Sequence, residues 1–145
     1  MKVIASIVLA LILAGCASTQ SIQFSPSQDY AVSVRAELFD AVRIDNNDIT
    51  LFNEGKALGF IRVEPVPADA PPTSEFLSTL KSASESDTVQ TKTLEVSPGF
   101  NGFSAKVGDY QTGYLINEQD PDVILILSFP EGTFEEVTDT ISSGI

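Results

Sequence analysis

Ser78 and Lys81 are separated by two residues, a spacing that on a helix would bring the ammonium group close to the hydroxyl. A lysine made neutral by burial could then take the serine proton and activate the oxygen as a nucleophile. However, Leu80 belongs to the apolar stripe of this segment, so Ser78 and Lys81 fall toward its polar side. We therefore expect a solvated helix face at this position.

The residue types needed for most hydrolytic and redox chemistry are missing from the sequence. There is no histidine, and Cys16 is the only cysteine. The chain therefore has no Ser-His-Asp or Cys-His arrangement and no common zinc site. A single cysteine also excludes a disulfide within the chain. We expect a protein that is not an enzyme, with no catalytic residue, no metal ligand set and no cofactor.

Two acidic turns offer carboxylates. Residues 45–48 carry four oxygen-bearing side chains, but a calcium loop of the EF-hand kind needs a glutamate at its twelfth position, where this chain has Lys56. In the second turn, Glu118, Asp120 and Asp122 could bind a cation or form a paired acid and base. We expect both groups to be ordinary turns, and we expect the carboxylates of the second turn to point into water.

Glycines alternate with aromatic residues in the segments 99–103 and 108–114. Glycine permits close approach of a ligand, and aromatic side chains could line a shallow pocket. The alternative is that these residues are core anchors and bends of a twisted sheet. As the possible ligand or partner surface, the sequence indicates Phe100, Phe103, Tyr110 and Tyr114.

The N-terminal segment has the pattern of a targeting sequence. A lysine at position 2 precedes residues 3–13, which are apolar except for Ser6 and are too few to span a bilayer as a helix. They run into Leu13-Ala14-Gly15-Cys16, which resembles the lipobox of bacterial lipoproteins. The resemblance implies cleavage before Cys16, a diacylglycerol on its thiol and often an acyl chain on the new amine. Together these chains would anchor the protein in a membrane.

Sorting and charge further restrict the setting. The residues after the cysteine are Ala17 and Ser18 rather than aspartate. Within the lipoprotein resemblance this implies the outer membrane, with the domain facing the periplasm; the inner membrane and the cell surface are alternatives. The whole chain has a formal charge of −12, and loss of Lys2 with the leader lowers it to −13. Such a charge argues against a nucleic-acid partner, because phosphates would be repelled.

The hydrophobic pattern predicts a leader at 1–15, a lipidated cysteine with a flexible tether at 16–28 and a single α+β domain at 29–145. Strand patterns lie near 30–38, 40–44, 49–52, 57–66, 88–96, 103–107, 110–116 and 123–129. A helix capped by Thr73 should present Phe76, Leu77, Leu80 and Ala83 to a sheet. A second helix should begin with a Thr133–Glu136 capping box.

This order of elements predicts a mostly antiparallel sheet packed by two helices. A hairpin-rich start, a helix after a proline-rich link, the strand "VILILSFPEG" and the closing "FEEVTDTISS" resemble the PsbP-like fold over residues 29–145. That family includes photosystem II extrinsic proteins and bacterial envelope lipoproteins. The resemblance implies a binding or assembly accessory role and carries no catalytic motif.

These observations favour a membrane-anchored, non-catalytic binding or accessory module for another envelope protein. Its contact with the membrane would be the acyl chains on Cys16. Two alternatives remain open. One is a lipoprotein that binds a small ligand or cation through the glycine-aromatic region and the acidic turns. The other is an envelope hydrolase that uses carboxylates such as Asp120 and Asp122.

Overall fold

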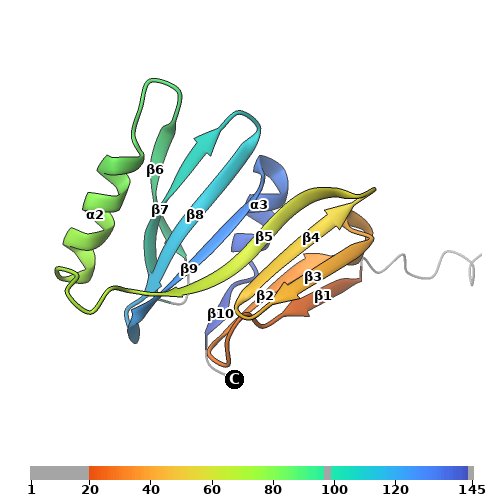
Figure 1. Cartoon of the computed structure of the whole chain (residues 1–145), viewed down its shortest axis with the longest axis horizontal. Helices are drawn as coiled ribbons and strands as arrows, with labels where there is room; N and C mark the ends of the chain where they lie inside the picture. The colour runs from red at the N-terminus through yellow and green to blue at the C-terminus, as the bar shows by residue number, and fades with distance from the viewer. Residues whose placement is uncertain (1–19, 97–98, 144–145) are drawn as a thin grey trace, which may run out of the picture.

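Two antiparallel sheets form the framework of the protein (Figure 1). The computed structural model describes residues 20–96 and 99–143. The smaller sheet has the strand order β1-β2-β10, and the larger has β3-β4-β5-β9-β8-β7-β6. The elements are β1 (Ser21–Phe24), β2 (Tyr30–Arg35), the 3-10 turn η1 (Ala36–Leu38), β3 (Ala41–Asp45), β4 (Asp48–Asn53), β5 (Lys56–Pro65), α2 (Thr73–Ser84), β6 (Gln90–Val96), β7 (Phe100–Val107), β8 (Tyr110–Asn117), β9 (Asp120–Pro130), α3 (Glu131–Thr138) and β10 (Ser142–Ser143).

Strand β9 lies at the centre of the seven-stranded sheet, between β5 and β8. Its continuous apolar run contributes to both faces, because successive side chains of a strand point in opposite directions. Ile124 belongs to one buried cluster, whereas Leu125 and Leu127 belong to the other. The strand pattern near 123–129 therefore forms a central strand with buried side chains on both faces.

The inner face of this sheet holds the main hydrophobic core. It includes Leu51, Ile61, Leu127 and Phe129, all fully buried. The three-stranded sheet and α3 cover it, since their apolar side chains belong to the same cluster and α3 contacts β2, β8 and β9. Most of the burial that stabilises the fold therefore occurs on this face.

The opposite, outer face is covered at one end. Leu77 of α2 packs with Phe103, Ile116 and Ile124, and α2 contacts β7. In Figure 1, α2 accordingly lies at the β6–β7 end of the sheet, while β3 and β4 lie at the other end. Among the described residues, no helix is long and apolar enough to cross a membrane.

The structure confirms the predicted mixture of a mostly antiparallel sheet and two helices, and the strand patterns near 40–44, 49–52 and 57–66 form the antiparallel meander β3-β4-β5. Both predicted helix caps are wrong. Helix α2 follows Pro72 and α3 follows Pro130, and neither has a side-chain cap. Both prolines occupy the N-cap position with extended ψ values of 146° and 144°, and they offer no side-chain oxygen to the first helical amides.

Part of the predicted tether is folded. Residues 21–24 form β1, which pairs with β2 from Ser21 opposite Arg35 to Phe24 opposite Val32. Phe24 belongs to the inner-face core, which supplies the free energy that orders this strand. The predicted leader at 1–15 and the lipobox with Cys16 lie outside the described residues.

Candidate functional site

The distribution of phenylalanines distinguishes one part of the outer face. The chain has nine phenylalanines, and seven of them belong to the two hydrophobic clusters or pack against them. Phe52 and Phe60 do neither, and both are partly exposed. Large apolar side chains that remain outside a core and lie together on one surface can mark a binding site.

Strand periodicity explains why these two rings face outward. On β5, Ile61 and Val63 are buried in the inner-face core, so Phe60 and Arg62 must point to the outer face. On β4, Leu51 is fully buried on the inner side, and a bulge separates it from Phe52. Phe52 is then paired with Ala57 of β5.

Each of the two rings lies beneath an arginine. The guanidinium carbon of Arg43 lies 5.5 Å from the centre of the Phe52 ring, and that of Arg62 lies 5.1 Å from the centre of Phe60. Such contacts contribute about 0.5–1 kcal/mol each at exposed sites. Within the described residues Arg43 makes no ion pair, so its charge is not matched by a carboxylate.

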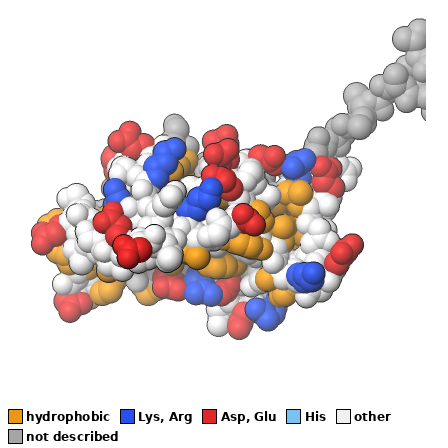
Figure 2. Space-filling model, turned by 90° about the horizontal axis from the view of Figure 1, so that it is seen from above, with side chains coloured by type: hydrophobic (Ala, Val, Ile, Leu, Met, Phe, Trp, Pro, Cys, Tyr) orange, Lys and Arg blue, Asp and Glu red, His pale blue; other side chains and the backbone are white. Residues whose placement is uncertain are grey.

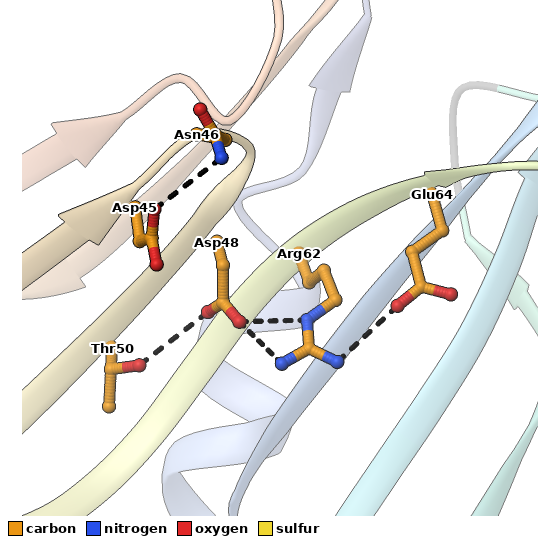
Figure 3. Close-up of polar contacts among 6 residues, drawn as sticks. All are labelled: Asp45, Asn46, Asp48, Thr50, Arg62 and Glu64. Atoms are coloured by element: carbon orange, nitrogen blue, oxygen red, sulfur yellow. Dashed lines mark hydrogen bonds and ion pairs between the residues drawn. The ribbon is translucent and has the colours of Figure 1, made fainter.

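Arg62, by contrast, is held by two carboxylates (Figure 3). Its Nε donates to Oδ2 of Asp48 at 2.9 Å, a second nitrogen bonds the same oxygen, and Nη1 donates to Glu64 at 3.3 Å. The hydrogen bonds to Asp48 raise the pKa of the Arg62 guanidinium. These bonds fix the plane of the guanidinium above Phe60, whereas Arg43 has no such carboxylate partner among the described residues.

Small hydroxyl side chains extend this surface toward the centre of the sheet. Thr50 lies opposite Phe60, Phe60 opposite Ser128, and Ser128 opposite Thr112. The hydroxyls of Thr112 and Ser128 are 2.8 Å apart and hydrogen-bonded. We call the following outer-face side chains the open half: Arg43, Thr50, Phe52, Phe60, Arg62 with its carboxylate partners Asp48 and Glu64, and Thr112, beside which Ser128 is buried. From above, Figure 2 shows hydrophobic patches bordered by side chains of both charges.

Three of the four predicted surface residues lie on the outer face. Phe103 is buried and stacks on Tyr114, with ring centres 4.9 Å apart. Tyr110 is 41% exposed at the margin of the open half, and its hydroxyl donates to the carbonyl oxygen of Ala57 at 3.2 Å. Phe100 lies on the inner face, where its ring centre is 5.4 Å from that of Tyr30. The four therefore do not line one pocket.

The structure also gives the contacts of the Ser78–Lys81 motif and of the acidic turn at residues 45–48. Lys81 donates to the hydroxyl of Thr93 at 3.2 Å, and no hydrogen bond joins it to Ser78. Asp48 is engaged by Arg62. Within the described part of the chain, no group of three or more histidine, cysteine or acidic side chains could hold a metal ion.

The expectation that Asp120 points into water is wrong. Its Oδ2 accepts a hydrogen bond of 2.8 Å from the hydroxyl of Tyr30, which is only 2% exposed. Burial of the phenol, and then this bond, raise the pKa of Tyr30. The second acidic turn thus ties β9 to β2.

The open half was not identified from the sequence, although its pattern is visible there. The run Phe60-Ile61-Arg62-Val63 alternates, and the two apolar β-branched residues belong to the core. The outward pair is then an aromatic ring beside an arginine, and the strand across the turn carries Phe52. In the comparisons with known proteins, no family model matches the chain and no similar curated protein was found.

Proposed function

We propose that the protein is a lipid-anchored, non-catalytic accessory module of the cell envelope whose open half binds another envelope protein. The observation that carries this proposal is the pair of phenylalanines outside both cores, each beneath an arginine. Aromatic residues and arginines are enriched where proteins bind one another. The resemblance of the sequence to the PsbP-like fold over residues 29–145 implies the same kind of role.

The chemistry of the open half favours a protein partner with apolar and acidic side chains. Phe52 and Phe60 provide apolar area, and the guanidinium of Arg43, which makes no ion pair with a described residue, can bind a carboxylate through two parallel hydrogen bonds. The small hydroxyls of Thr50 and Thr112 leave the surface low enough for close approach. Acyl chains on Cys16 would hold the domain beside its partner on the membrane.

Site-specific photo-crosslinking tests the partner proposal in cells. A benzoylphenylalanine at Thr50, in the full chain expressed in a diderm bacterium, should capture one dominant envelope protein. The same probe at Glu135, an exposed position on α3, is the control and should not. Phe60→Ala should abolish the adduct from Thr50. An identical set of abundant adducts from both positions, unaffected by Phe60→Ala, would contradict the proposal.

Metabolic labelling tests the anchor separately. A clickable fatty acid should label the full chain, and Cys16→Ser should remove the label and release the domain from the membrane fraction. Retention of the label in the Cys16→Ser variant would contradict lipidation at this residue while leaving the surface proposal intact.

A further inference from the structure

A groove runs along one flank of α2 on the outer face, at the far end of the sheet from the open half. It consists of two adjoining hollows of about 310 and 340 Å³ that share Ser74, Leu77 and Asn101. Helix α2 lines the first hollow with Ser74, Leu77, Ser78 and Lys81, which lie at helical spacing, and Thr73 at the start of the helix lines the second. We call these two hollows the α2 groove.

The opposite wall of the α2 groove is the edge of the sheet. Thr93, Leu94 and Glu95 of β6 line the first hollow. Strand β6 is the last strand of the sheet, and within the described residues it pairs only with β7. Every second residue of β6 therefore directs its backbone N–H and C=O outward, where an added strand could bind them.

The floor of the α2 groove is apolar and its two ends differ in charge. Leu77 and Phe103 lie in the floor. At one end the ammonium group of Lys81 donates to the hydroxyl of Thr93 and has no carboxylate partner among the described residues. At the other end Glu118 accepts a hydrogen bond of 2.6 Å from Asn101.

The length of the α2 groove suits a short extended segment. Ser74 and Lys81 are seven residues apart, which is about 10 Å along a helix at 1.5 Å per residue. An extended chain advances about 3.3 Å per residue, so about three residues span this distance. The exposed hydroxyls of Ser74 and Ser78 make no hydrogen bond within the described chain and are available to such a segment.

We propose that the α2 groove binds an extended peptide segment of another protein, which adds as a strand to β6. An apolar side chain of the segment packs on Leu77 and Phe103. An acidic side chain or terminal carboxylate binds Lys81, and a basic group at the other end binds Glu118. This site goes beyond the function proposed above, because it shares no residue with the open half.

Peptide selection on the full chain in detergent tests the proposal. The probe is a library of random heptapeptides on phage, followed by synthesis of the consensus peptide and measurement of its Kd by fluorescence anisotropy. We expect a consensus with an acidic residue, and Ser78→Arg should weaken binding at least about tenfold by filling the groove. Ser82→Arg, the same substitution at an exposed residue of the same helix that lines neither hollow, should leave the Kd within about twofold.

Charge reversal and hydrogen exchange complete the test. Lys81→Glu should lose the consensus peptide and recover binding to its acid-to-lysine analogue. Bound peptide should slow hydrogen exchange of the outward amides of β6. The proposal is overturned if no peptide is enriched relative to the Ser78→Arg chain, if both arginine variants bind alike, or if β6 exchange is unchanged. Equal affinity for the free amino acids would indicate a small-ligand site and would also overturn it.

Discussion

The two faces of β5 show what separates a stabilising surface from a binding surface in this protein. On the inner face, Ile61 is fully buried beneath the second sheet and α3. On the outer face, the adjacent residue Phe60 has no hydrophobic partner cluster and lies under Arg62. Burial explains the conformation of the inner residues. The outer rings Phe52 and Phe60 belong to neither core, so we expect them to contribute little to the stability of the isolated domain and more to binding.

The largest change in stability is expected when one phenylalanine is replaced on each face of the sheet. Phe129 is fully buried on the inner face, and Phe129→Ala should lower the free energy of unfolding by about 3–5 kcal/mol through lost burial and a cavity. Phe60 lies on the neighbouring strand and faces the other way, so Phe60→Ala should cost only about 1 kcal/mol. Urea unfolding followed by circular dichroism gives both values.

The outcome of that pair decides between two views of Phe60. Similar losses for the two variants would mean that the outer ring is part of the core and would remove the main observation behind the open half. A small loss for Phe60→Ala, together with loss of the crosslinked partner, would assign the ring to binding.

A second test adds a methyl group instead of removing a ring. A Cβ at Gly59 would lie 2.3 Å from both the Phe129 ring and the carbonyl oxygen of Ser128, so Gly59→Ala should destabilise by about 1–3 kcal/mol. At Gly132 in α3 a Cβ meets no atom within 4 Å, and Gly132→Ala should stabilise by about 0.5–1 kcal/mol. Thermal unfolding measures both. If Gly59→Ala left the free energy of unfolding unchanged, the inner face around Gly59 would have to be packed more loosely than the structure shows.

The sequence predicted the strands and helices where local patterns dominate. The alternation of β5 and the apolar run of β9 depend on burial alone, and both were located correctly. The predicted caps are wrong because Thr73 is the first residue inside α2 and Thr133 the third residue inside α3, and a proline occupies each N-cap position. The pairing of β1 with β2 depends on a distant core that packs against Phe24, which no local pattern reveals.

The candidate site was harder to predict because it arises from the register between strands. Phe103 and Tyr114 come together through the pairing of β7 with β8, while Phe100 is placed on the opposite face. Arg43 reaches the Phe52 ring from the neighbouring strand β3. A sequence shows which residues alternate but not which face of the sheet stays uncovered, since that depends on where α2 packs.

A third test concerns the hydrogen bond between Tyr30 and Asp120 and the pH dependence of stability that it causes. Tyr30 is buried and donates to Asp120, which raises its pKa. In the unfolded chain the phenol ionises near pH 10, whereas in the folded chain it keeps its proton. Above pH 10 the unfolded state therefore binds fewer protons, and stability falls as pH rises, by up to about 1.4 kcal/mol per pH unit from this group.

Tyr30→Phe should remove that dependence. At pH 8 the variant should lose about 1 kcal/mol with the hydrogen bond, and between pH 8 and 11 it should lose about 1 kcal/mol less than the wild-type chain. Urea unfolding at the two pH values gives the difference, to which the other tyrosines contribute equally in both proteins. Parallel losses would mean that the Tyr30 hydroxyl is exposed to water.

The smallest expected effect on stability is at Arg43, where we expect a large effect on binding. Arg43 is exposed and its charge contacts only the Phe52 ring among the described residues, so Arg43→Gln should change the free energy of unfolding by about 0.5 kcal/mol or less. The same substitution removes the one guanidinium of the open half that no carboxylate holds, and the adduct from Thr50 should fall at least about tenfold. Arg35→Gln, which breaks exposed ion pairs with Glu37 and Glu136 away from this surface, should leave the adduct unchanged. Equal adduct yields from the wild-type chain, Arg43→Gln and Arg35→Gln would show that the partner does not bind the charge above Phe52. Recognition would then depend on the aromatic rings alone.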